Sequence, residues 1–228
     1  MTGNYVHFGV LELYNDNCFV VLSRMAFQRI LALNMEELPK YKSAEKTVYT
    51  YIQEFLKFHS ELALLNYECK TVMIIVNLTK LGLGTESSEI ITSCCSALDE
   101  FLLFIVRERF KSKQKLALQQ AITLFLNEAT PLLLEINETL FRMACFEEGD
   151  YMYAVANPLF TLMLLNKALF EQVKGPVLES EKSASARERL FEELQKLFEG
   201  VTFSLEGGDR NKFLSNFTKF KASIRGIV

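Results

Sequence analysis

Few residues in this sequence are suited to acid–base or metal chemistry near neutral pH. The chain contains two histidines, His7 and His59, and neither stands in an E-x-x-H or H-E-x-x-H pattern. His7 lies among aromatic residues and His59 ends an expected helix, so packing or compensation of the helix dipole explains each. We therefore predict no catalytic residue and expect that the chain is not an enzyme.

The five cysteines show no redox or metal-binding pattern. They form an odd set without a C-x-x-C pair, and no secretory apolar segment precedes them, which indicates a reduced, intracellular protein. The adjacent Cys94 and Cys95 would point about 100 degrees apart on a helix, with no histidine near them in the sequence. We expect both to be core residues and predict no metal site.

The segment Gly82-Leu83-Gly84-Thr85 resembles a phosphate-binding loop only superficially. It follows an expected helix rather than a strand, and it lacks the Gly-Lys-Ser/Thr ending that holds phosphate and Mg²⁺. Glycines in this position are typical of the end of a helix. The sequence therefore predicts no bound cofactor.

Positive charge gathers in two segments. The first contains Arg107, Arg109, Lys111, Lys113 and Lys115. It falls at a predicted helix end and the following turn, where a solvated loop is the favoured interpretation. The second contains Arg210, Lys212, Lys219, Lys221 and Arg225, against Asp209, in the last expected helix. We treat this second basic face as a candidate contact surface for an acidic partner.

Net charge and the length of the apolar stretches argue against two classes of protein, those that bind nucleic acid constitutively and those that span a membrane. The net charge is −3 and the pI is near 5.6, which disfavours a constitutive nucleic-acid-binding protein. The most apolar stretch, residues 155–165, is broken by Asn157 and Pro158. It is too short for a membrane span, which needs about 18 apolar residues or more.

Apolar residues recur at helical spacing through almost the whole chain, and no segment alternates as a strand would. The expected buried stripes are Phe19, Leu22, Ala26, Ile30 and Leu33 in the first helix; Val48, Tyr51, Ile52, Phe55 and Leu56 in the second; Ile91, Cys95, Leu98, Leu102 and Ile105 in a long helix after Thr85; and Phe213, Phe217, Phe220, Ile224 and Ile227 in the last. A further helix, from Cys69 to about Leu83, is apolar on nearly every side and should lie between neighbours.

Capping patterns set the expected helix boundaries. Thr130-Pro131 has the cap-plus-proline pattern of a new helix, which would follow a helix carrying Leu118, Ala121, Ile122 and Phe125. Asn157-Pro158 repeats the pattern: it either starts a helix that ends at Gly175-Pro176, which we favour, or kinks a longer one. Ser185 with Glu188 predicts a capping box, and Asp209 predicts the cap of the last helix.

These patterns predict an all-α fold of eight to ten antiparallel amphipathic helices joined by short turns. Two helices per unit give a unit of about 45 residues, as in HEAT and armadillo repeats. We expect residues 1–228 to form a single helical-repeat segment, a HEAT-like α-solenoid, with a compact helical bundle as the alternative.

The two ends of such a stack should differ. The last helix can turn its Phe residues inward and leave Arg210, Lys212, Lys219 and Lys221 outward. The first helix has apolar residues beyond its stripe, namely Val20, Val21, Met25, Phe27 and Leu31, and the preceding segment from Tyr5 to Val10 is apolar too. We expect an exposed apolar patch there, through which the isolated chain would self-associate.

Several strings together resemble one family. They are Asn4-Tyr5-Val6-His7-Phe8-Gly9-Val10 with Leu13-Tyr14; Ser93-Cys94-Cys95-Ser96-Ala97-Leu98-Asp99; Pro158-Leu159 leading to Leu164-Leu165-Asn166; and Asp209-Arg210-Asn211-Lys212-Phe213 with Phe217 and Phe220. In this order they resemble the C-terminal part of an exportin-seven-like nuclear transport receptor of the importin-β (karyopherin) superfamily. The resemblance covers essentially the whole chain, although the segment from Glu36 to Tyr67 is divergent.

The resemblance implies the C-terminal arm of a longer HEAT-repeat receptor. Such receptors carry protein cargo through the nuclear pore under the control of the small GTPase Ran in its GTP form. The expected partners are cargo, nuclear pore proteins and Ran, the last mainly through repeats outside this chain, and the expected localisation is the nucleus and cytoplasm. A general helical-repeat scaffold for protein interactions is the alternative function, and an all-helical enzyme is a more distant one.

Overall fold

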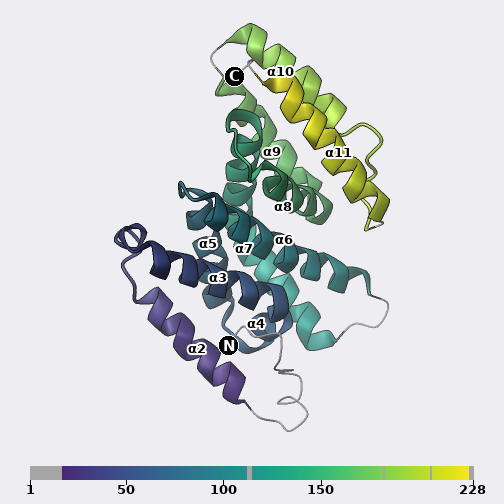
Figure 1. Ribbon diagram of the computed structural model, residues 1–228. Helices are drawn as coiled ribbons and strands as arrows, with labels where there is room; N and C mark the ends of the chain where they lie inside the picture. The colour runs from purple at the N-terminus through teal and green to yellow at the C-terminus, as the bar shows by residue number, and fades with distance from the viewer. Residues whose placement is uncertain (1–16, 112–114, 182, 206, 226–228) are drawn as a thin grey trace.

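The computed structural model describes residues 17–111, 115–181, 183–205 and 207–225, and within them the chain is all-α (Figure 1). The elements are α2 (Cys18–Leu31), a short 3-10 turn (Leu38–Lys40), α3 (Lys42–Phe58), α4 (Ser60–Asn66), α5 (Cys69–Leu83), α6 (Ser88–Phe110), α7 (Leu116–Phe146), α8 (Met152–Leu165), α9 (Lys167–Glu179), α10 (Ala184–Leu197) and α11 (Gly207–Ile224). No strand occurs in these ranges. His7, Lys113, Ile227 and the string from Asn4 to Tyr14 lie outside them.

The helices from α3 onward stack in two layers. One layer is α3, α6, α8 and α11 in succession, and the other is α4 and α5, then α7, α9 and α10. The chain crosses between layers at each pair until α9, after which α10 stays in the second layer and α11 returns to the first. Figure 1 shows the stack running from α2 at one end to α10 and α11 at the other. Each pair packs on the pairs before and after it, as in an α-solenoid.

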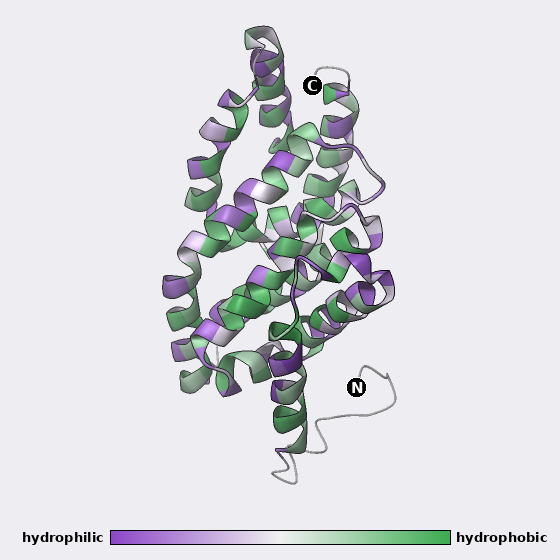
Figure 2. Cartoon of the chain, turned by 90° about the vertical axis from the view of Figure 1, so that its left-hand side faces the viewer, coloured by the Kyte–Doolittle hydropathy of each residue, from purple (hydrophilic) through white to green (hydrophobic). Residues whose placement is uncertain are grey.

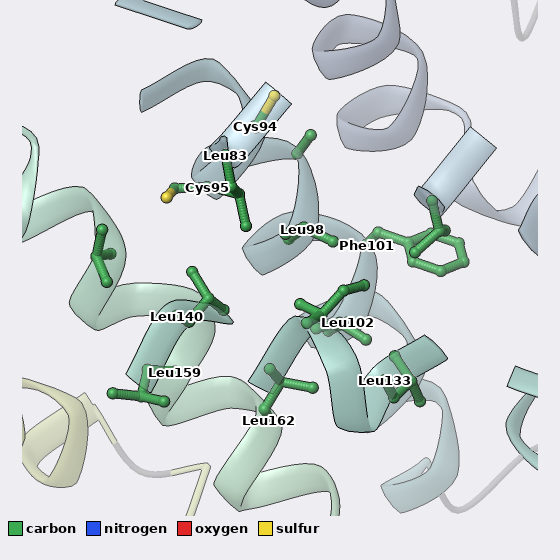
Figure 3. Close-up of a cluster of buried hydrophobic side chains, with 14 of the residues drawn as sticks. Leu83, Cys94, Cys95, Leu98, Phe101, Leu102, Leu133, Leu140, Leu159 and Leu162 are labelled. Carbon is green, nitrogen blue, oxygen red and sulfur yellow. The ribbon is translucent and has the colours of Figure 1, made fainter. Parts of the chain in front are cut away.

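Most helices are two-sided, with apolar and polar residues on different parts of their surface (Figure 2). The centre of the core lies where α6 meets α7 and α8. Leu98 and Leu102 of α6 lie with Leu140 of α7 and with Leu159 and Leu162 of α8 in one buried cluster (Figure 3). The predicted stripe of this long helix, from Ile91 to Ile105, is therefore confirmed.

The cysteines and glycines near this cluster have structural roles. Cys94 and Cys95 are buried core residues as expected, and burial is the main reason that the pKa of the Cys95 thiol rises to about 12. Gly82 packs against the Cys94 sulfur and the Tyr49 ring so closely that a Cβ would overlap both. The helix α5 ends at Leu83, which confirms that segment 82–85 is a helix end.

The prediction that Thr130-Pro131 starts a helix is wrong. The helix α7 runs unbroken from Leu116 to Phe146 with Pro131 inside it. Its buried stripe continues across the proline through Phe125, Ala129 and Leu133, so packing favours one helix. Pro131 lies on the exposed face, and the carbonyl left without an N–H donor belongs to the exposed Asn127, where water can reach it.

The favoured start at Asn157-Pro158 and the end at Gly175-Pro176 are also wrong. Pro158 lies inside α8, within an apolar stripe that begins before it, and Pro176 lies inside α9. The break between the two helices falls at Asn166, whose side chain accepts a hydrogen bond from the Ala168 N–H at 3.1 Å. Asn157 does not cap a helix, because its amide donates to the Tyr153 carbonyl.

Two further details differ from expectation. The cap of α10 is Ser183, which accepts from the Ala186 N–H, so Ser185 lies in the first turn rather than in a capping box. In α2 the buried side chains are Phe19, Ser23, Phe27 and Ile30. Leu22 is exposed and Ala26 is half-buried, because α2 is rotated to place Phe27 against Tyr51 and Phe55 of α3. Leu33 is exposed and lies beyond the end of α2 at Leu31.

Candidate interaction surfaces at the two ends of the stack

The helix α11 docks through its phenylalanines, as predicted. Phe213, Phe217, Phe220 and Ile224 recur at i, i+4, i+7 and i+11, and all are buried. The Phe213 ring lies 5.4 Å from the Phe160 ring of α8. This stripe fixes which side of α11 remains for a partner.

Arg210, expected on the outward basic face, points inward instead. Its guanidinium donates to both carboxylate oxygens of Asp99, at 2.9 and 2.7 Å, and to Thr161 Oγ1 at 2.6 Å. Thr161 Oγ1 donates to Asp99 Oδ1 at 2.5 Å. The Asp99 side chain is only 9% exposed and that of Arg210 is 25% exposed. The guanidinium also lies over the Phe160 ring, 5.6 Å from its centre.

Lys221 likewise faces the fold. Its ammonium donates to the carbonyls of Ala144 at 3.0 Å and Glu147 at 2.6 Å, at the C-terminal end of α7. These carbonyls have no partner within their own helix, so the lysine satisfies and neutralises a helix terminus. Burial is the main cause that lowers the pKa of Lys221.

Lys212, Lys219 and Arg225 are the exposed members of the predicted basic face. Arg225 lies 3.3 Å from the Glu148 carboxylate in an exposed ion pair, which contributes little to stability. Between Lys212 and Lys219 the outer surface of α11 consists of small polar side chains, including Ser215 and Thr218. The structure thus divides the predicted face into two inward cations and three outward ones.

The helical phase of α11 is the signal that separates the two groups. Arg210 precedes Phe213 by three positions and Lys221 follows Phe217 by four, so both share the apolar stripe. Lys212 and Lys219 fall outside that phase. Asp99 and Thr161 were not predicted, although Asp99 follows the buried Cys95 by four residues on α6.

Asp209 does not cap α11 but lies within its first turn. Its carboxylate accepts from the Thr202 N–H at 3.3 Å, the Thr202 hydroxyl at 2.5 Å and the Ser204 N–H at 2.7 Å. It therefore holds the preceding loop, in which Phe203 adopts a positive φ of 55°. The hydroxyl of Thr202 is the main cause that lowers the Asp209 pKa to about 2.

The opposite end of the stack exposes apolar side chains on α2, as expected. Val21 is 52% exposed and Met25 is 54% exposed, one helical turn apart. Leu22 and Leu31 are also exposed but lie on opposite sides of the helix, whereas Val20 and Phe27, both expected to be part of the patch, are half-buried and buried respectively. We call Val21 and Met25 the α2 face.

Of the two histidines considered as acid–base candidates, His59 lies among the described residues. This residue separates α3 from α4, its ring lies 4.4 Å from the Phe19 ring, and burial lowers its pKa. In the described ranges no three His, Cys, Asp or Glu side chains gather where they could hold a metal. No described helix is both long and apolar enough to cross a membrane.

Within the described ranges these features define an all-α protein whose helices pack in a two-layered stack. Ran-binding protein 17 of Homo sapiens is 25% identical over 231 residues, covering 98% of this chain and 21% of the relative. Exportin-7-B of Xenopus laevis is 22% identical over 231 residues, with the same coverage. Exportin-7 of Dictyostelium discoideum is 22% identical over 227 residues, covering all of this chain and 22% of the relative.

The comparison confirms the resemblance that the sequence motifs indicate. The chain is similar, over nearly its whole length, to a segment of exportin-7-like nuclear transport receptors, and it spans about a fifth of the length of the curated relatives it matches. No family model and no solved structure matches it.

Proposed function

We propose that this chain is the C-terminal arm of an exportin-7-like nuclear transport receptor. In that role it is non-enzymatic: its helix faces contact protein cargo, Ran-GTP or pore proteins while the receptor moves between nucleus and cytoplasm. The observation that carries the proposal is the match to exportin-7 and Ran-binding protein 17, at 22–25% identity, over 98% of a chain that folds as a two-layered helical stack.

The difference between the two ends of the stack supports the proposal that the chain is an arm of a longer receptor. The α2 face is apolar and exposed, so a preceding helical pair would bury it. The outer side of α10 and α11 is mostly polar, with Glu188, Glu192, Lys212 and Lys219 exposed, although Phe191 of α10 is also 42% exposed. Exposed apolar side chains on α2 and a mostly polar outer side of α10 and α11 are what we expect of an arm that continues beyond α2.

Three of the five basic residues predicted as a contact surface on α11 remain candidates under this proposal. Lys212, Lys219 and Arg225 are the residues proposed to contact an acidic partner, because they are exposed on the outer side of the last helix. Arg210 and Lys221 would support that surface from within by fixing α11 on α6, α7 and α8.

A chimeric receptor tests the proposal. The matching segment of Xenopus laevis Exportin-7-B is replaced by residues 1–228, and Ran-GTP-dependent cargo binding is measured by calorimetry. We expect the chimera to bind cargo, and the receptor lacking the segment to bind poorly. A folded chimera that binds cargo no better than the deletion would contradict the proposal and favour a scaffold unrelated to transport. The isolated chain should bind Ran-GTP weakly or not at all, and submicromolar affinity would contradict the assignment as an arm.

A further inference from the structure

The helix α2 lies at the edge of the stack and docks through one narrow side. The two layers begin at α3, and α2 packs against α3 and the end of α4 (Figure 1). Its buried side chains recur at i, i+4, i+8 and i+11: Phe19, Ser23, Phe27 and Ile30. This is the spacing with which an amphipathic helix lies in a groove of another protein.

An aromatic surface receives the buried side of α2. The Phe27 ring is 1% exposed. Its centre lies 5.3 Å from the Tyr51 ring, 4.7 Å from the Phe55 ring and 6.1 Å from the Tyr67 ring. Tyr51 and Phe55 belong to α3, and Tyr67 directly follows α4. We call these three rings the aromatic seat. They also lie against one another, so without a helix on top they would form a contiguous apolar patch.

Two polar contacts fix the register of the helix on the aromatic seat. The Tyr67 hydroxyl donates to Ser23 Oγ at 2.7 Å, and Ser23 is completely buried. The Arg24 guanidinium donates to the Asn66 carbonyl at the end of α4 and lies 5.7 Å from the centre of the Tyr67 ring. An apolar residue in place of Ser23 would leave the Tyr67 hydroxyl without this acceptor. The seat therefore selects a helix with a small hydroxyl side chain at this position.

The helix α2 has little stability of its own. It is 14 residues long, and isolated helices of that length are marginal in water. Its N-cap residue, Asn17, makes no side-chain capping hydrogen bond, and no acidic residue stands in its first turn. Residues 32–37 join α2 to Leu38, which is buried in the core and anchors this connector. Undocking therefore breaks the contacts of one side of α2 and leaves the layers from α3 onward in place.

We propose that the aromatic seat is a docking site for an amphipathic helix of a partner protein, and that α2 is a strap that covers the seat until the partner binds. The partner helix carries the pattern of α2: a phenylalanine, a small hydroxyl residue four positions later followed by an arginine, and a second phenylalanine after another four. The arginine would take the place of Arg24 at the C-terminal end of α4, where a cation is favoured.

The tether of α2 decides which occupant can displace it. A tethered helix competes at an effective concentration of roughly millimolar, so a partner helix must bind more tightly than α2 does alone. The α2 of a second copy would leave an identical seat of its own and gain no contact by the exchange, which favours a partner protein. The inference does not depend on the proposed transport function.

The test uses the full chain and a fluorescein-labelled peptide of residues 19–33. In the peptide Val21→Glu and Met25→Lys prevent association through the α2 face. Fluorescence anisotropy compares the unaltered chain with Phe27→Ser, which removes the central anchor of its own strap. This strap variant should bind the peptide at least about tenfold more tightly, because α2 no longer competes. Leu22→Ser, on the exposed part of the same helix, is the matched control and should bind as the unaltered chain does.

The buried hydroxyl pair tests where the peptide binds. A peptide that also carries Ser23→Val should bind the strap variant at least about tenfold more weakly, and adding Tyr67→Phe to that variant should remove the difference. Hydrogen exchange of the unaltered chain should show the amides of α2 opening faster than those of α6. This last measurement needs no variant, so it decides even if Phe27→Ser fails to fold.

Four results would overturn the proposal: no peptide binding to the strap variant, equal binding to it and to the unaltered chain, indifference to Ser23→Val, or amides of α2 protected as long as those of α6. A dimer of the full chain that Phe27→Ser abolishes, and that Val21→Lys with Met25→Lys leaves intact, would identify a second copy as the occupant and would also overturn it.

Discussion

Arg210 and Asp99 are 111 positions apart in the sequence and form the main charged contact between α11 and α6. The pair is mostly removed from water, so removing one partner should destabilise the fold strongly. A buried carboxylate without a counter-ion is far less favourable than the intact pair. The guanidinium is held by two hydrogen bonds to the Asp99 carboxylate, by a third to the Thr161 hydroxyl, and by its contact with the Phe160 ring. The residue thus serves the docking of the last helix rather than the recognition of a partner.

Breaking this pair should be costly. Arg210→Met leaves the Asp99 carboxylate buried without its counter-ion and should lower the free energy of unfolding by about 3 kcal/mol, measured by urea denaturation. The control Lys212→Met, on the exposed face of the same helix, should change it by no more than about 0.5 kcal/mol. The double variant Arg210→Met with Asp99→Leu should recover much of the loss. Equal effects of the two single variants would show that Arg210 does not anchor α11.

The Asp209 carboxylate should titrate at low pH. Its folded pKa of about 2 lies below the ordinary value of 3.8, mainly because the Thr202 hydroxyl donates to the ionised form. The stabilisation is therefore present above the ordinary pKa and is lost as the pH falls from there towards 2. An NMR titration of the side-chain carboxyl should show this value, and Thr202→Val should raise it. A pKa near 3.8 in the unaltered chain would show that Asp209 does not hold the loop.

At the scale of elements, the helices themselves were predictable and several of their boundaries were not. The helices that contain Leu98 and Phe217 were predictable because the spacing of their apolar residues places those residues on one face of a helix. Pro131 and Pro158 mislead because local capping rules treat a proline as a start, whereas the buried stripes of α7 and α8 continue across both. The helical phase of α11 puts Arg210 on the buried side of the helix, but its partner Asp99 lies 111 positions away in α6 and could not be predicted from any local pattern.

Pro131 offers a direct test of the continuous helix. Pro131→Ala should stabilise the chain by roughly 1–2 kcal/mol, because alanine restores an N–H donor in the middle of α7 and removes the clash of the ring. The gain is below the full helix-interior penalty because the proline also restricts the unfolded chain. Thermal denaturation followed by circular dichroism measures it. A loss of stability would mean that a helix boundary lies at this position after all.

The docking stripe of α11 has a complementary test. Phe217→Asp places an unpaired charge among buried aromatic side chains and should cost several kcal/mol, about 3 or more. Ser215→Asp, two residues away on the exposed side, is the matched control and should have little effect. An unchanged melting temperature for Phe217→Asp would place the stripe in solvent.

At the scale of the whole molecule, the unequal ends predict self-association of the isolated chain. Val21 and Met25 are half-exposed on neighbouring turns of α2, so two copies gain by burying them together. Light scattering across a concentration series should show association that Val21→Lys with Met25→Lys abolishes. The control Ile74→Lys with Leu124→Lys adds the same charge elsewhere. A strictly monomeric chain, or association insensitive to the α2 changes, would show that the α2 face needs no cover.

Nuclear export by the chimeric receptor tests the central claim most directly. A fluorescent cargo of Exportin-7-B is followed from nucleus to cytoplasm in cells that depend on the chimera carrying residues 1–228. We predict export well above that of the receptor lacking the segment, and loss of export when the segment carries Phe217→Asp, which undocks α11. Export no faster than that of the deletion, from a chimera that is expressed and folded, would contradict the account of this chain as the arm of a nuclear transport receptor.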